Sequence, residues 1–199
     1  MRQEIMNAAV HTVARYGLDK ATTRLIAAEV GLNEMYLYRC FKNKEDILSE
    51  TFHAKDAAFI NRIRKSLPVM RREDLPWERR CFLLWQDCWE FIVKRPDDCR
   101  FYIHYYYSAN CKAYAYAEHL KLYKPLIDEI RFAFLPDTNV DMLLHQIFDT
   151  MLSFAERVQT GEYSDNEETL KSTFRQIFSF VAINARPELL KETSGETIE

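Results

Sequence analysis

The chain has 199 residues, of which 48% are apolar, and it carries a formal net charge of −3. Only four glycines and six prolines interrupt long stretches with helical spacing, and no alternating run between turn signals reads as a hairpin. The composition excludes a β-rich fold and predicts an all-α globular protein, built as one large domain or as a small domain attached to a larger one.

The chain shows no sign of export or of a membrane span. Its longest apolar pieces, such as "CFLLW", fall far short of the roughly eighteen residues needed to cross a bilayer. The start, "MRQEIMNAAV", has no apolar signal core. We therefore expect a cytoplasmic protein without a membrane partner.

The cysteines are odd in number and form no C-x-x-C pair. Buried thiols in a reducing compartment are the favoured interpretation. A redox sensor that uses Cys81 and Cys88, seven residues apart on one helix face, is the alternative.

The charge is uneven along the chain. Residues 1–65 hold eleven Lys and Arg and eight Asp and Glu, whereas the remainder is acidic. The first part is therefore the one that can approach a polyanion.

Four helices are expected in this first part. The first covers residues 2–16 and ends at Gly17, and the second starts at Thr22 or Thr23 and ends at Gly31. Asn33 caps a third helix that runs to about residue 41. Asn43 caps a fourth over 44–67, whose early acidic residues suit the positive end of the helix dipole.

The segment "PVMRREDLP" is expected to separate two regions. Beyond it, helical spacing predicts helices near 76–95, 97–109, 112–135, 140–160 and 166–184. The polar end, 191–199, is expected to fray.

The second and third helices, joined by a glycine turn, predict a helix-turn-helix, in which the second helix enters the major groove of DNA. The exposed Tyr, Lys and Arg side chains that follow the turn suit this role. Such groups donate hydrogen bonds to phosphate oxygens, and Arg also pairs with guanine.

At this point the sequence resembles the TetR family of bacterial transcriptional regulators. The stretches "ATTRLIAAEVGL" and "LYRCFKNKEDIL" are similar to the family's T-x-x-x-I-A-x-x-x-G-[VL] and L-Y-x-x-F-x-[SN]-K-E-x-L. The resemblance covers roughly the first fifty residues. It implies a DNA-binding domain over 1–47, a connecting fourth helix over 44–67, and a helical effector-binding and dimerisation domain over 68–199.

The resemblance also implies roles for residues of the helix-turn-helix. Positions such as Tyr38 usually contact phosphates, whereas Arg39 and its exposed neighbours reach bases or the flanking backbone. Met35 and Tyr36 stand where the family commonly has a small residue and then Thr or Ser. Their bulk is expected either to change the bases that are read or to pack against a thymine methyl, without abolishing binding. The predicted DNA-binding residues are Thr22, Thr23, Arg24, Glu34, Met35, Tyr36, Tyr38, Arg39, Lys42 and Lys44.

For the second region the resemblance implies a small, largely apolar or aromatic effector, which would be held among the central helices. Aromatic side chains concentrate there, and they suit such a site. The candidates are Trp85, Trp89, Tyr102, His104, Tyr105 and Tyr106. In one alternative, these aromatic side chains simply belong to the hydrophobic core. In another, Asp87, Glu90 or Asp141 faces the site, which would then bind a cationic aromatic ligand.

The last two long helices are where the family builds a four-helix dimer interface, and they are rich in apolar side chains. The predicted interface residues are Met142, Leu143, Ile147, Met151, Phe154, Leu170, Phe174, Ile177, Phe178 and Val181. A two-fold homodimer would present two recognition helices to a near-palindromic operator, about one DNA turn apart.

The expected function is a homodimeric repressor that a small effector releases from its double-stranded DNA operator. An enzyme is disfavoured because the sequence holds no phosphate-binding loop, no nucleophile elbow and no metal-ligand spacing. No catalytic residue, metal or cofactor is therefore predicted. The alternative is a helical small-molecule sensor or interaction module that no longer binds DNA.

Overall fold

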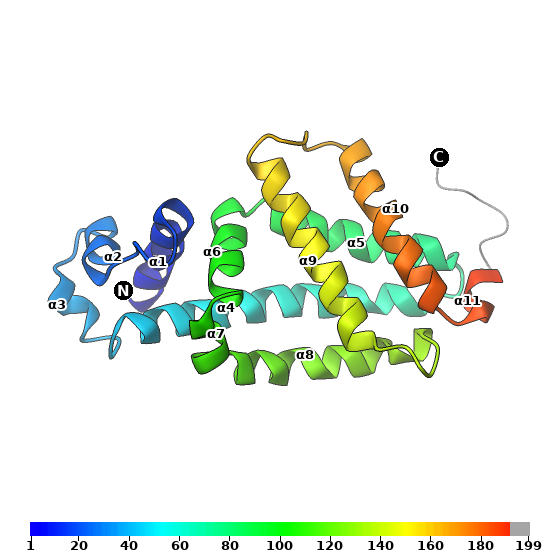
Figure 1. Cartoon of the computed structure of the whole chain (residues 1–199), viewed down its shortest axis with the longest axis horizontal. Coiled ribbons are helices and arrows are strands. Elements are labelled where there is room, and N and C mark those ends of the chain that lie inside the picture. The colour runs from blue at the N-terminus through cyan, green and yellow to red at the C-terminus, as the bar shows by residue number, and fades with distance from the viewer. Residues whose placement is uncertain (192–199) are drawn as a thin grey trace. The chain divides into compact units, whose positions relative to one another are not determined.

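The computed structural model describes residues 1–191 and is helical throughout (Figure 1). No strand occurs in that range, where the only β pairing is an isolated bridge between Phe134 and Ala185. This confirms the all-α prediction. The elements are α1 (Arg2–Tyr16), α2 (Thr23–Glu29), α3 (Glu34–Leu37), α4 (Lys44–Ser66), η1 (Leu67–Arg71), α5 (Trp77–Val93), α6 (Pro96–Tyr106), α7 (Ala109–Tyr114), α8 (Tyr116–Ile130), η2 (Arg131–Ala133), α9 (Val140–Gln159), α10 (Glu167–Asn184) and α11 (Pro187–Lys191).

The chain divides into two compact units. The first unit combines residues 1–58 with 95–122, and the second combines 59–94 with 123–191. Helices α4 and α8 each begin in the first unit and end in the second. The functional division predicted at residues 47 and 68 stays a prediction.

Most predicted helices are present within a few residues of their expected bounds. The main difference is the helix expected over 112–135, which is divided into α7, α8 and η2. Ser108 accepts a hydrogen bond from the amide of Cys111 and so starts a separate short helix. The expectation for the polar end concerns residues that, apart from Lys191, lie outside the described range.

The turn between α2 and α3 depends on glycine. The amide of Gly31 donates to the carbonyl of Ala28 over 3.1 Å, and the amide of Leu32 donates to that of Ala27 over 2.9 Å. Gly31 has a φ of 66°, which side chains disfavour. Asn33 then caps α3 by accepting from the amide of Met35. These local bonds explain why the helix breaks and resumes in a new direction.

The core of the first unit joins α1, α2, α3 and the first half of α4 to α6. The side chains of Ile5, Ile26, Leu37 and Leu48 are fully buried. Helix α6 packs against α1, and Phe101 on α6 is also fully buried. Burial of these side chains holds the two short helices on a rigid base.

In the second unit, α5 contacts α9, α10 and η1. Phe82 on α5 meets Phe174 on α10 edge to face, with ring centroids 5.2 Å apart. Phe59 on α4 meets Phe148 on α9 in the same way at 4.4 Å. These aromatic contacts tie together the helices that surround the cavity described below.

Within residues 1–191, no helix combines the length and the apolar character that a membrane crossing requires. The same residues contain no cluster of three or more His, Cys, Asp or Glu side chains placed to hold a metal ion.

Candidate functional sites

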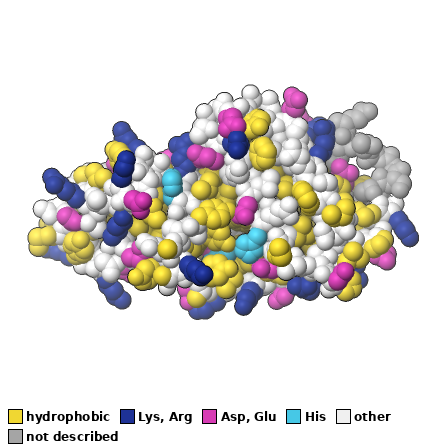
Figure 2. Space-filling model, viewed as in Figure 1, with side chains coloured by type: hydrophobic (Ala, Val, Ile, Leu, Met, Phe, Trp, Pro, Cys, Tyr) yellow, Lys and Arg dark blue, Asp and Glu magenta, His cyan; other side chains and the backbone are white. Residues whose placement is uncertain are grey.

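The outer side of α3 presents large side chains to solvent. Met35 is 75% exposed, Tyr36 and Arg39 are exposed, and Leu37 between them is fully buried. The Arg39 guanidinium lies 4.6 Å from the centroid of the Tyr36 ring, so the two form a cation–π pair. In Figure 2, hydrophobic and basic side chains lie side by side over α1 to α3, at the left of the view. We call Met35, Tyr36 and Arg39 the reading surface.

The predicted helix to residue 41 is shorter in regular α geometry and ends at Leu37. The chain continues as a tighter turn, in which the amide of Arg39 donates to the carbonyl of Tyr36 over 3.3 Å and that of Cys40 to Leu37 over 3.0 Å. This tightening keeps Arg39 on the same exposed side as Tyr36.

A carboxylate lies among the hydroxyl groups that were expected to contact phosphates. Thr23 donates to Glu34, and the Tyr38 hydroxyl lies 3.4 Å from both Thr23 Oγ1 and Glu34 Oε1. Glu34 therefore orients Tyr38 and Thr23.

The other predicted DNA-binding residues of the helix-turn-helix differ in their exposure and in their contacts within the protein. Thr22 caps α2 by accepting from the amide of Leu25, while Arg24 and Lys42 are exposed. Lys44 is only partly exposed, and its Nζ donates to the carbonyl of Leu18 over 3.0 Å. Lys44 thus has a structural contact that the sequence did not indicate.

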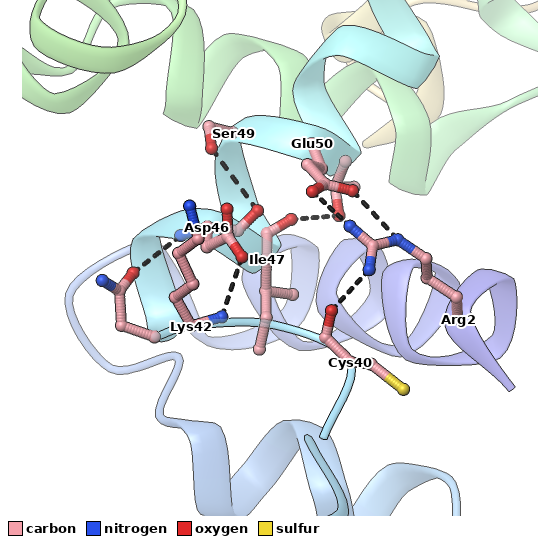
Figure 3. A network of polar contacts seen from close by, with 9 residues as sticks. Arg2, Cys40, Lys42, Asp46, Ile47, Ser49 and Glu50 are labelled. Atoms are coloured by element: carbon pink, nitrogen blue, oxygen red, sulfur yellow. Dashed lines mark hydrogen bonds and ion pairs between the residues drawn. The ribbon is translucent and has the colours of Figure 1, made fainter. Parts of the chain in front are cut away.

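A polar network connects α1, the segment after α3 and α4 (Figure 3). Arg2 on α1 binds the carboxylate of Glu50 on α4 and the carbonyl of Cys40. Asp46 accepts from the amide of Lys42 over 2.8 Å, next to the cap that starts α4. These contacts fix the segment after α3 to the first turn of α4.

Two of the predicted effector-binding tyrosines anchor α6 to α4 inside the first unit. Tyr102 donates to Asp56 over 3.0 Å, and Tyr105 donates to Glu45. Burial and the neighbouring carboxylates raise the pKa of both hydroxyls, so they act as neutral donors. His119 also contacts Asp56, with Nδ1 3.0 Å from Oδ2.

The other effector candidates are distributed over both units. On α6, His104 is exposed, and Tyr106 stacks on Tyr102 with centroids 5.5 Å apart. On α5, Trp89 is buried and stacks on Trp85 at 5.9 Å. Of the predicted set, Trp85 alone belongs to the lining of the cavity in the second unit.

That cavity has a volume of about 130 Å³ and lies among the second half of α4, η1, α5, the end of α8, α9 and α10. Its lining is almost entirely aliphatic and aromatic and includes Trp77 and Trp85 from α5 and Phe148 and Met151 from α9. Enclosure by apolar helices in one compact unit is typical of a site for a small apolar ligand.

The acidic residues considered for a cationic ligand do not line this cavity. Asp87 is bound by Arg62 and Ser66, Glu90 pairs with Lys94, and Asp141 is exposed. The cavity therefore offers a cation no counter-charge among the residues that the structure describes.

Cys81 and Cys88 both line the cavity. Burial raises the pKa of both thiols, that of Cys88 to about 12. The reactive thiolate is therefore rare near neutral pH, which disfavours redox sensing by this pair.

The predicted dimer residues lie mainly inside the protomer. Six are buried in the second unit, Ile147, Phe154 and Phe178 are half-buried, and Met142 is 68% exposed. Phe180 and Ile183, which are not in the predicted set, are exposed on α10, Ile183 by 73%. Their spacing of three residues places them on one helix face.

Comparisons with known proteins agree with this architecture. Residues 5–51 match the pattern of the bacterial regulatory proteins of the tetR family. A fatty acid metabolism regulator protein of Bacillus subtilis is 36% identical over 64 residues, which cover 32% of this chain and 33% of that relative. The chain thus spans about a third of the length of this curated relative.

Solved structures extend the likeness over the whole fold. A TetR family transcription regulator from Marinobacter aquaeolei superposes with a TM-score of 0.73 at 19% identity, covering 89% of this chain and 93% of that one. The regulator FadR from Bacillus subtilis, solved with stearoyl-CoA, gives 0.68 at 19% identity over 91% and 97%. At this identity the likeness shows a shared fold.

Proposed function

Because the chain belongs to the TetR family of bacterial transcriptional regulators, we propose that it is a repressor that binds a near-palindromic operator as a homodimer and releases it on binding a small effector. The observation that carries the proposal is the reading surface. Met35 and Tyr36 project from the short capped helix α3 and Arg39 from the turn that follows it, while Leu37 on the opposite side of α3 is buried.

The proposal is tested by selecting duplexes from a random DNA pool with the purified protein at two salt concentrations. A near-palindromic consensus whose affinity falls as salt rises supports the regulator. Absence of enrichment at both salt concentrations supports instead the sensor module that has lost DNA binding. Glu34 favours this second candidate, because its carboxylate places negative charge beside the Tyr38 hydroxyl.

We place the dimer interface on the outer faces of α9 and α10. Met142 on α9 and Phe180 and Ile183 on α10 are exposed apolar side chains, and burying them against a second copy would stabilise the dimer. The buried members of the predicted set would support this surface from beneath.

We place the effector in the cavity of the second unit. Its apolar lining supports a largely apolar ligand, and a relative of the same fold binds stearoyl-CoA. Helix α4 runs from the helix-turn-helix to this cavity, where Phe59 and Ile63 contribute to the lining. Ligand binding would weaken operator binding by a coupling free energy of about 1–3 kcal/mol. Equal operator affinity with and without a bound effector would contradict this part.

A further inference from the structure

The cavity of the second unit presents apolar atoms to a ligand on nearly every side. Its lining comes mainly from α4, η1, α5, α8, η2, α9 and α10, and none of the lining side chains in the described part of the chain is acidic, basic or an amide. Polar side-chain groups in the lining are confined to Trp77, Trp85, Tyr123, Cys81 and Cys88. The chemistry of the site therefore depends on whether a ligand can reach any of these groups.

The tryptophan and tyrosine side chains turn their carbon atoms to the cavity. The indole Nε1 atoms of Trp77 and Trp85 have almost no accessible area, although both side chains line the cavity. Their N–H groups therefore do not face the space that a ligand would occupy. The Tyr123 hydroxyl lies 3.5 Å from His145 Nδ1, and His145 is not part of the lining. The aromatic rings thus provide apolar contact and no hydrogen bond.

A charged ligand finds no counter-charge in this lining. Burial raises the pKa of the Cys81 and Cys88 thiols, so both stay neutral. The Arg71 guanidinium lies 4.5 Å from the centroid of the Phe132 ring, which lines the cavity, but Arg71 itself is exposed and does not line it. An ion inside the cavity would lose its hydration without gaining a counter-ion, which disfavours carboxylates and ammonium groups.

The size of the cavity limits the ligand further. Its volume of about 130 Å³ is close to the roughly 150 Å³ of an engineered apolar cavity that stays dry and binds benzene. Pockets for drug-sized ligands begin at roughly 300 Å³. Stearoyl-CoA, with which the regulator FadR from Bacillus subtilis was solved, is far larger than this cavity. The cavity therefore matches one ring or a hydrocarbon of similar size.

We propose that this cavity selects a compact, neutral hydrocarbon about the size of one ring, which is held by apolar contact alone and forms no hydrogen bond with the protein. Benzene, its alkyl derivatives and small alicyclic or branched hydrocarbons form this class. Burial of the ligand's apolar surface drives binding. The role of such a molecule as an effector rests on the function proposed above.

The first experiment compares four ligands by calorimetric titration of the full-length protein. Toluene represents the class, phenol has almost the same size but carries a hydroxyl, naphthalene adds a second ring, and decanoate carries a chain and a carboxylate. Toluene should bind at least about 10-fold more tightly than phenol or decanoate, because the hydroxyl or carboxylate would be buried without a partner. It should bind at least about 5-fold more tightly than naphthalene, which has more apolar surface but overfills the cavity.

The second experiment locates the bound toluene with two neighbouring leucines of α5. Leu83 and Leu84 are both half-buried, but Leu84 lines the cavity and Leu83 does not. Leu84→Trp fills part of the volume and should weaken toluene binding at least about 10-fold. Leu83→Trp is the matched control, because it adds the same side-chain volume outside the cavity and should leave toluene affinity unchanged.

Absence of toluene binding up to its solubility limit would overturn the proposal. Binding of phenol, naphthalene or decanoate as tight as that of toluene would also overturn it. Tight phenol binding would reveal a polar anchor, and tight decanoate binding would show that a carboxylate reaches a cation such as Arg71. Equal weakening of toluene binding by Leu83→Trp and Leu84→Trp would place the ligand outside the cavity. If neither variant folds, the ligand series on the unmodified protein still decides.

Operator binding is measured separately, so that the ligand class and the proposed function are tested independently. The duplex is the one obtained by the selection described above. Toluene binding in the cavity without operator release would refute the effector role alone. Operator binding by a protein that rejects toluene would refute the ligand class alone.

Discussion

At the scale of single residues, Lys42 and Lys44 are both predicted to contact DNA, and Lys44 also has a contact within the protein. Lys42 is exposed, whereas Lys44 donates to the Leu18 carbonyl. We predict that Lys42→Ala lowers the salt dependence of operator affinity by about one phosphate contact without changing Tm. Lys44→Ala should also remove about 1–2 kcal/mol of stability. Thermal unfolding measures the change in stability, and DNA titration at several salt concentrations measures the salt dependence of operator affinity. Equal Tm values for the two variants would contradict the structural role of Lys44.

Arg39 is predicted to read sequence. Its side chain stacks on Tyr36 at the reading surface, where Arg can pair bidentately with guanine. Arg39→Ala should therefore remove about 1–3 kcal/mol of discrimination at one base pair per half-site. Competition between operator duplexes altered at single positions measures this loss. A uniform decrease for all duplexes would instead identify Arg39 as a phosphate contact.

At the scale of elements, the turn between α2 and α3 determines how the recognition helix is presented. Gly31 has a φ of 66°, and a Cβ there would meet no atom within 4 Å, so substitution costs backbone strain alone. Gly31→Ala should lower stability by about 1–2 kcal/mol and also weaken operator binding.

Gly161 provides the matched control for this prediction. It lies after α9 with a φ of 80° and equally open surroundings. Gly161→Ala should cost similar stability yet leave operator affinity unchanged. Chemical denaturation and DNA titration of the two variants decide the question, and an unchanged operator affinity in Gly31→Ala would show that the turn does not position α3.

At the scale of the whole molecule, the proposed homodimer predicts that DNA binding depends on a second copy. Ile183→Glu would place a charge in the proposed interface, so the dimer should dissociate and operator affinity should fall by at least about tenfold. Lys124→Glu introduces a negative charge on an exposed position of α8, outside the proposed interface, and should change neither property. Sedimentation analysis reports the oligomeric state. If the Ile183→Glu variant remained a dimer, the interface would have to lie on another surface.

The sequence by itself determined the features that depend on near neighbours. Helix breaks at Gly17 and Gly31 and the caps at Asn33 and Asn43 follow from local backbone geometry, and these signals are sufficient to predict the helix-turn-helix. The exposed side of α3 also followed from helical period, although its tighter last turn did not.

Tertiary structure decided where the apolar and aromatic side chains of the larger region face. Tyr102 and Tyr105 looked like ligand contacts, but their partners Asp56 and Glu45 are far away in sequence and hold α6 on α4. Buried apolar residues such as Ile177 look the same in sequence whether they face their own core, a cavity or a second copy. Their environment is set by the packing of distant helices, which periodicity within one helix does not encode.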